Sequence, residues 1–145
     1  MCRVEDLTVV IVDTDHIALK RSCTSLEKLG LKKIICVDSY QDAVTTLENE
    51  KSVDIVVSDY NIASGEELGI VLCSFLKQKY PSILFVLLSE EYSCTIAYNS
   101  LANQADDLLD KKRDGEIEEL MKKWVKLAQL KCETRDIFYG PRKIN

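Results

Sequence analysis

Acidic side chains, one serine and one lysine follow short apolar runs at four places in the sequence. Asp13 and Asp15 follow one run, Asp59 another, Ser89 a third and Lys111 the last. Neighbouring carboxylates repel one another unless a cation lies among them, and Mg²⁺ prefers such oxygen ligands. A carboxylate beside Mg²⁺ can attack a phosphoryl group and form an acyl phosphate, whose oxygens a lysine and a serine can bind. These residue types therefore indicate phosphoryl chemistry.

The residues can act together only if the fold gathers them, and the apolar pattern predicts such a fold. Continuously apolar runs are typical of strands buried on both faces of a parallel sheet. The predicted strands cover 7–12, 33–37, 53–58, 83–88 and 107–109. The helical segments between and after them cover 17–29, a stretch around 43–47, 68–79, about 93–103, and 114 to about 128. The prediction is an α/β fold, a doubly wound parallel sheet with helices on both faces.

Ligands of such sheets bind at the carboxyl ends of the strands, so this fold would bring the polar residues to one edge. Each residue alone has a structural explanation, because aspartate and serine commonly end strands and cap helices. A lysine at position 111, beside Lys112 and Arg113, could equally be solvated. The combination of all four strand ends favours a functional site.

Composition excludes several classes of protein. The chain has 145 residues, enough for one domain, and a net charge of −5 without a basic block, so no nucleic-acid partner is expected. We expect no membrane association, since no apolar run is long enough to cross a bilayer and the first residues do not resemble a signal peptide. The six cysteines form no CxxC pair, and we interpret them as reduced, mostly buried residues of a cytoplasmic protein.

The order and spacing of these residues resemble the receiver domain of two-component response regulators, which has the chemotaxis-type fold. The stretches that carry the resemblance are Val9–Asp15, Val53–Asn61, Phe85–Ser89 and Ala105–Lys111. The resemblance extends over about residues 7–130 and implies a five-stranded (βα)5 sheet with strand order 2-1-3-4-5. We therefore expect a receiver domain over 1–131 and a tail, or the start of a linker, over 132–145.

The resemblance also implies a role for each site residue. Asp59 would accept the phosphoryl group, Ser89 would be the switch hydroxyl, and Lys111 would bind the phosphate. Mg²⁺ would be held by Asp13, Asp15 and Asp59 and by the backbone carbonyl of Asn61.

Several positions depart from the family pattern. The family usually has two adjacent acids after its first strand, whereas Thr14 holds the second position here and Asp15 follows one residue later. We therefore expect either that Asp15 replaces the missing acid or that Mg²⁺ binds weakly. Glu90 stands where a small residue usually gates the acceptor. The other departures are Leu108 in place of the switch aromatic, Lys112 in place of a proline, Ile62-Ala63 in place of Met-Pro, and a turn glycine that is either Gly65 or Gly69.

A receiver domain implies signalling partners and not an enzyme. A histidine kinase or a phosphotransfer protein in a phosphorelay would phosphorylate Asp59, and the phosphoprotein would signal through the face of its fourth helix, fifth strand and fifth helix. That face would bind a downstream protein target or an output domain, and a homodimer through it is left open.

Two other functions remain as alternatives. The first is a pseudo-receiver, an interaction module that is independent of phosphorylation, which the departures at Thr14, Glu90, Leu108 and Lys112 favour. The second is a phosphohydrolase of the haloacid-dehalogenase type, with Asp13 as nucleophile and Asp15 as general acid. Against it, Lys111 follows the acidic pair Asp106-Asp107 instead of preceding it, and Asp59 would have no role.

Overall fold

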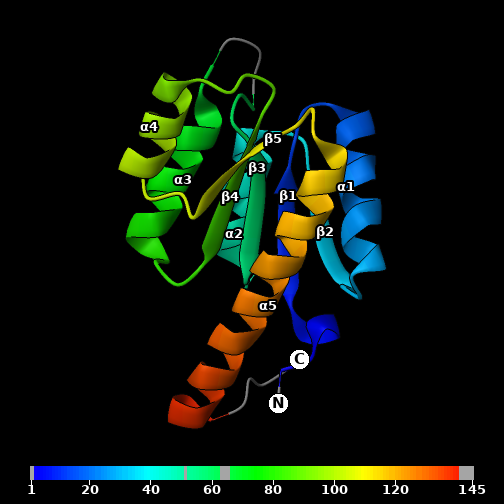
Figure 1. The fold of residues 1–145 in the computed structure, drawn as a ribbon. Coiled ribbons are helices and arrows are strands. Elements are labelled where there is room, and N and C mark those ends of the chain that lie inside the picture. Colours follow the sequence, from blue (N-terminus) through cyan, green and yellow to red (C-terminus); the bar gives the residue numbers. More distant parts are fainter. Residues whose placement is uncertain (1, 51, 63–65, 141–145) are drawn as a thin grey trace.

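The computed structural model describes residues 2–50, 52–62 and 66–140; for 114–116 it describes the backbone only. A short 3-10 helix, η1 (Val4–Asp6), precedes alternating strands and helices (Figure 1). The strands are β1 (Thr8–Val12), β2 (Lys33–Val37), β3 (Ile55–Asp59), β4 (Leu84–Ser89) and β5 (Asp107–Asp110). The α-helices are α1 (His16–Lys28), α2 (Tyr40–Asn49), α3 (Leu68–Lys79), α4 (Cys94–Ala102) and α5 (Asp114–Tyr139).

The five strands form one sheet in the order β2-β1-β3-β4-β5, and every pairing is parallel, which confirms the predicted fold. The register aligns the carboxyl ends of the central strands. Val12 lies beside Ser58, and Asp59 lies beside Leu88. The polar residues that follow these strands consequently meet at one edge of the sheet.

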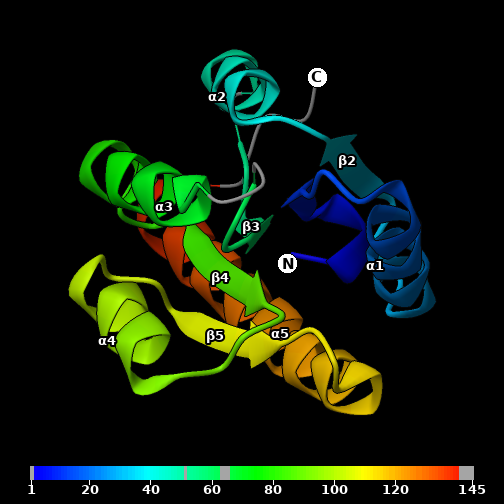
Figure 2. The same ribbon diagram turned by 90° about the horizontal axis from the view of Figure 1, so that it is seen from above.

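Side chains alternate between two hydrophobic layers along each central strand. In β1, Val9 and Ile11 belong to the layer that also contains residues of α1 and α5, whereas Val10 and Val12 belong to the layer with residues of α2, α3 and α4. All four are at most 1% exposed. Viewed from above, the helices lie on both sides of the sheet, as Figure 2 shows. This burial on both faces explains why the runs in β1, β3 and β4 contain almost no polar residue.

Helix α5 is longer than the sequence pattern predicted. Its apolar stripe was expected to end near residue 128 and a tail to begin at 132, but the helix continues to Tyr139 (Figure 1). The last turns project past the sheet and expose Ile137, Phe138 and Tyr139, each at least 75% accessible. The missed signal is the pair Gly140-Pro141, because glycine followed by proline commonly marks a helix end.

The interpretation of the cysteines was wrong for most of them. Four are paired as disulfides, Cys2 with Cys132 and Cys23 with Cys36. Cys73 is buried and free, and Cys94 is exposed and free. Both pairings join cysteines on different elements, which the spacing of cysteines along the chain could not indicate.

Candidate functional site

The carboxyl edge of the sheet gathers two aspartates and a lysine. Asp13 follows β1, Asp59 ends β3, and Lys111 follows β5. The Lys111 Nζ lies 2.8 Å from Asp13 Oδ2 and 3.3 Å from Asp59 Oδ2. The three side chains are only 3%, 14% and 12% exposed for Asp13, Asp59 and Lys111, respectively. One buried cation therefore bridges two largely buried carboxylates.

Burial makes Asp59 an unusual carboxyl group. Desolvation raises its pKa to about 6, and the negative charge of Asp13 acts in the same direction. The charge and hydrogen bond of Lys111, together with the backbone N–H of Asn61, oppose this rise. For Lys111, burial favours the neutral amine, but Asp13 and Asp59 outweigh it and raise the lysine pKa. At neutral pH Lys111 is therefore an ammonium group that the two aspartates share.

The pKa of Asp59 predicts how the stability of the protein depends on pH. Because the folded pKa lies above the ordinary value of 3.8, the folded state loses stability as pH rises from about 4 to about 6. We expect Asp59→Asn to stabilise the fold at pH 7 by about 1–2 kcal/mol, after allowance for solvent screening. Lys111 still has Asp13 as its partner in this variant.

Urea unfolding of the metal-free protein between pH 4 and pH 7 measures this effect. The advantage of Asp59→Asn should shrink toward pH 4, where Asp59 is protonated in the wild type. Glu48→Gln, which removes an exposed carboxylate on α2, is the matched control and should leave the pH profile unchanged. An equal advantage of Asp59→Asn at pH 4 and pH 7 would contradict the assigned pKa.

Asp15 is placed differently from Asp13 and Asp59. Its carboxylate caps the N-terminus of α1, where it accepts hydrogen bonds from the backbone of Ile17 and Ala18 at 2.9 and 3.2 Å. These bonds hold the pKa of Asp15 below its ordinary value, with a smaller contribution from the charge of Lys111. Both Thr14 and Asp15 are exposed. The carboxylate of Asp15 is thus engaged by α1, within electrostatic range of the site.

Ser89 and Asn61 lie at the carboxyl ends of β4 and β3, respectively, but use their polar groups differently. The Ser89 hydroxyl donates to the Glu91 carbonyl at 2.6 Å and accepts from the Glu91 N–H at 3.2 Å. Ser89 is 1% exposed, so this side chain is turned into its own loop. Asn61 is exposed and directs its backbone N–H to Asp59. Glu90 is exposed and lines the approach to Lys111.

Two buried residues, Gly69 and Tyr60, lie next to the backbone of Asp59. Gly69, in the first turn of α3, packs against the backbone of Asp59 and Tyr60 so closely that a Cβ would lie 2.7 Å from the Tyr60 carbonyl oxygen. Of the two candidate turn glycines, Gly69 is the one that packs against this backbone. Gly65 lies outside the described residues. Sequence reasoning missed Tyr60, which is 1% exposed and accepts a hydrogen bond from Asn99 of α4 at 3.3 Å. Its only signal was an aromatic residue directly after Asp59.

The donor set fits Mg²⁺, though with fewer charges than expected. Asp13 and Asp59 supply largely buried carboxylate oxygens, the kind of ligand that Mg²⁺ prefers. Asp13, Asp15 and Asp59 do not bring three ligand atoms within 4.8 Å of one another. Among residues 2–50, 52–62 and 66–140, only Cys2, Cys132 and Asp136 do so, at the far end of α5.

A groove of about 720 Å³ opens beside Lys111. Residues of α1 line one side, among them Ile17, Lys20 and Arg21, and Ile117 and Glu118 of α5 line the other. Ile17 is 74% exposed, although it is a large apolar residue. The site therefore opens onto a surface that combines apolar and basic side chains. No helix in the described part of the chain is long and apolar enough to cross a membrane.

The fold and the aspartate–lysine site define an α/β domain of the chemotaxis-regulator type. Residues 9–124 match the family model of the response regulator receiver domain. Because the match spans most of the chain, the protein belongs to the response regulator receiver family. This result confirms the resemblance inferred from the residues and favours it over the haloacid-dehalogenase alternative. A search of curated proteins found no match.

Solved structures agree with this assignment. A response regulator from Thermotoga maritima has 28% identity and a TM-score of 0.71, covering 83% of this chain and 98% of its own. A CheY-like receiver domain protein from Methanospirillum hungatei has 19% identity and a TM-score of 0.73, with coverages of 86% and 98%. The signal receiver domain of an HD domain-containing protein from Pseudomonas fluorescens has 18% identity and a TM-score of 0.77, with coverages of 92% and 96%.

Proposed function

We propose that this receiver domain accepts a phosphoryl group on Asp59 and passes the signal to a protein partner. The observation that carries the proposal is the bridge of Lys111 between Asp13 and Asp59. A nucleophilic carboxylate next to a fixed ammonium can attack a phosphoryl group while the ammonium stabilises the charge that develops on its oxygens. Mg²⁺, held by Asp13, Asp59 and the carbonyl of Asn61, would supply further positive charge at the same place.

Lys111 and Ser89 have separate tasks in this proposal. Lys111 keeps Asp59 ionised at neutral pH and then binds an oxygen of the attached phosphoryl group. Ser89 can bind a second oxygen only if its hydroxyl leaves the Glu91 carbonyl. The proposed switch is therefore an exchange of the Ser89 hydrogen bond from its own loop to the phosphoryl group.

The groove beside Lys111 suits the phosphodonor partner. A histidine kinase or phosphotransfer protein has to place a phosphohistidine next to Asp59, and the groove along α1 leads there. Ile17 offers an apolar contact at its rim, and Lys20 and Arg21 offer contacts for acidic residues of the donor. The anionic Glu90 lies on the same path and would slow access to Asp59. We propose a cytoplasmic location, where such a donor is available.

The face of α4, β5 and α5 suits the recipient of the signal. On α4, Tyr98 and Leu101 are 70% and 76% exposed, respectively. Tyr60 connects this helix to the acceptor strand through its hydrogen bond with Asn99. Leu108 of β5 packs in the same hydrophobic layer as Tyr60, at the position where the family has its switch aromatic. A downstream protein or a second copy of the chain would bind here.

Intact mass after incubation with acetyl phosphate and Mg²⁺ tests the proposal. We expect one phosphoryl increment that disappears with time and requires Mg²⁺. Asp59→Asn should give no increment, and Glu48→Gln should behave as the wild type. An increment that persists in Asp59→Asn would place the acceptor elsewhere and overturn the assignment.

A second candidate function is a phosphorylation-independent interaction module. The position of Asp15 favours it, since its carboxylate caps α1 and leaves Mg²⁺ two buried carboxylates instead of three. No phosphoryl increment, together with no change in melting temperature on addition of Mg²⁺ and beryllofluoride, would exclude the first function and favour this one.

A further inference from the structure

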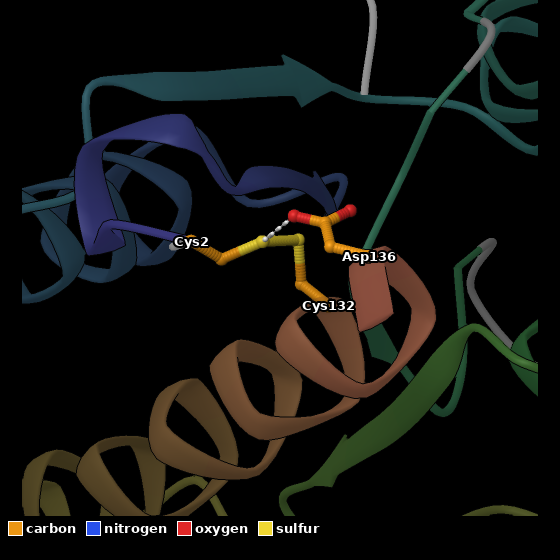
Figure 3. A group of neighbouring side chains, drawn as sticks. All are labelled: Cys2, Cys132 and Asp136. Carbon is orange, nitrogen blue, oxygen red and sulfur yellow. Dashed lines mark hydrogen bonds between the residues drawn. A yellow bond between two sulfur atoms is a disulfide. The ribbon is translucent and has the colours of Figure 1, made fainter. Parts of the chain in front are cut away.

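The two ends of the described chain meet at the amino-terminal side of the sheet. Cys2 precedes η1, Cys132 lies in the sixth turn of α5, and their sulfur atoms are bonded to each other (Figure 3). The family match covers residues 9–124. Both cysteines therefore lie outside the stretch that matches the family model, one on each side of it.

The surroundings of the pair suit a disulfide. The Cα atoms of Cys2 and Cys132 are 6.0 Å apart, within the span that a disulfide needs. The two residues are only 5% and 3% exposed, respectively, and belong to the hydrophobic layer of α1 and α5. The Gln129 side chain donates to the Cys2 carbonyl oxygen at 2.8 Å. Noncovalent contacts thus hold the two thiols in reach of each other before any bond forms.

We propose that Cys2 and Cys132 form a thiol–disulfide site that latches the extension of α5 to the N-terminus in response to oxidants. With a peroxide as oxidant, the two thiols lose two electrons and two protons, a sulfur–sulfur bond forms, and hydrogen peroxide is reduced to two waters. A dithiol reductant reverses the step by exchange. The bond closes a loop between residues 130 positions apart, so it strongly restricts the unfolded chain.

Asp136 makes the local contacts depend on the oxidation state. Its Oδ2 lies 3.3 Å from the Cys2 sulfur, and Figure 3 shows the carboxylate directed toward that atom. A thiol can donate a hydrogen bond across this distance, whereas a disulfide sulfur carries no hydrogen. The other oxygen, Oδ1, is buried without a partner among the described residues. The carboxylate therefore stabilises the reduced pair more than the oxidised one, which keeps the site reversible.

The other cysteines are less suited to this role. Cys23 of α1 and Cys36 of β2 have Cα atoms 7.6 Å apart, which exceeds the usual span of a disulfide. Their bond joins neighbouring elements only 13 residues apart, so it closes a much shorter loop and restricts the unfolded chain less than the Cys2–Cys132 bond does. Cys73 and Cys94 have no cysteine partner. The proposal therefore concerns Cys2 and Cys132 alone.

The test compares the whole protein after dithiothreitol and after hydrogen peroxide. Nonreducing peptide mapping should find Cys2 joined to Cys132 only in the oxidised sample. Amide hydrogen exchange over residues 126–139 should be about tenfold slower in that sample, since the latch suppresses local opening. The melting temperature should be about 10 °C higher, as expected for closing so long a loop.

Variants show whether the latch causes these changes. Cys2→Ser should remove the effect of oxidation on residues 126–139, and Cys36→Ser, the matched control, should keep it. Asp136→Asn should shift the wild-type balance in a glutathione buffer toward the disulfide. The proposal is overturned if Cys2 and Cys132 stay unlinked after oxidation, or if they link without any change in exchange over residues 126–139. The wild-type comparison stands even if a variant fails to fold, and it does not depend on phosphorylation of Asp59.

Discussion

Lys111→Met should destabilise the folded protein by about 3 kcal/mol at pH 7, because it leaves two buried carboxylates without their shared cation. Asp13 and Asp59 are 3% and 14% exposed, so water cannot replace the ammonium effectively. Their mutual repulsion then acts without opposition. Urea unfolding at pH 7 measures the loss. The exposed neighbour supplies the control, since Lys112→Met should change stability by no more than about 0.5 kcal/mol.

The pH dependence of this variant identifies the cause. Lys111 lowers the pKa of Asp59, so its removal moves that pKa above the wild-type value of about 6. A folded pKa above the unfolded one means that stability increases as pH falls through it. The deficit of Lys111→Met should therefore shrink between pH 7 and pH 5, and Asp59→Asn in the same chain should reduce it at pH 7. A deficit that is constant across this range would point to lost packing of the lysine stem instead.

Gly69→Ala should have an effect of similar size by a different route. The added Cβ would lie 2.7 and 2.9 Å from the carbonyl oxygen and Cα of Tyr60, and closer still to the Asp59 carbonyl oxygen. Backbone atoms cannot move aside as a flexible side chain can, so α3 has to shift away from β3. We expect a loss of about 3 kcal/mol in the free energy of unfolding. Because the contact includes the backbone of Asp59, Gly69→Ala should also slow the proposed transfer of a phosphoryl group from acetyl phosphate to Asp59.

Gly140→Ala is the control for Gly69→Ala. Gly140 has a positive φ of 82° and nothing within 4 Å of an added Cβ, so this variant reports backbone strain without a contact. It should cost about 1 kcal/mol. If both variants lose the same stability and Gly69→Ala retains the wild-type phosphorylation rate, the close packing of α3 on Asp59 is not important.

Most of the fold could be predicted from the sequence because each signal was local. The runs that form β1, β3 and β4 are apolar without interruption, and α3 was predicted to cover 68–79, as observed. Ser39 and Ser93 cap α2 and α4 through the backbone of residues three positions later. Helix α5 was predicted too short because its last turns carry no apolar stripe against the sheet.

The site was predictable only in part, because its details depend on which groups compete for each polar atom. Strand order brings Asp13, Asp59 and Lys111 together, and the sequence pattern was sufficient to predict that. The pattern could not show that α1 engages Asp15 or that Glu91 engages the Ser89 hydroxyl. The approach of Cys2 to Cys132 depends on the whole fold, since 130 positions separate them.

The length of α5 gives the molecule a mechanical lever arm. The helix begins directly after the loop that carries Lys111 and runs for 26 residues, a length of about 39 Å at 1.5 Å per residue. With the Cys2–Cys132 bond open, a tilt of about 10° at the base of a rod of this length displaces its tip by about 7 Å, whereas the closed bond ties the rod to the N-terminus at Cys132. Small movements of the loop that carries Lys111 would then be detected at Ile137, Phe138 and Tyr139 by a partner bound to this exposed end of α5.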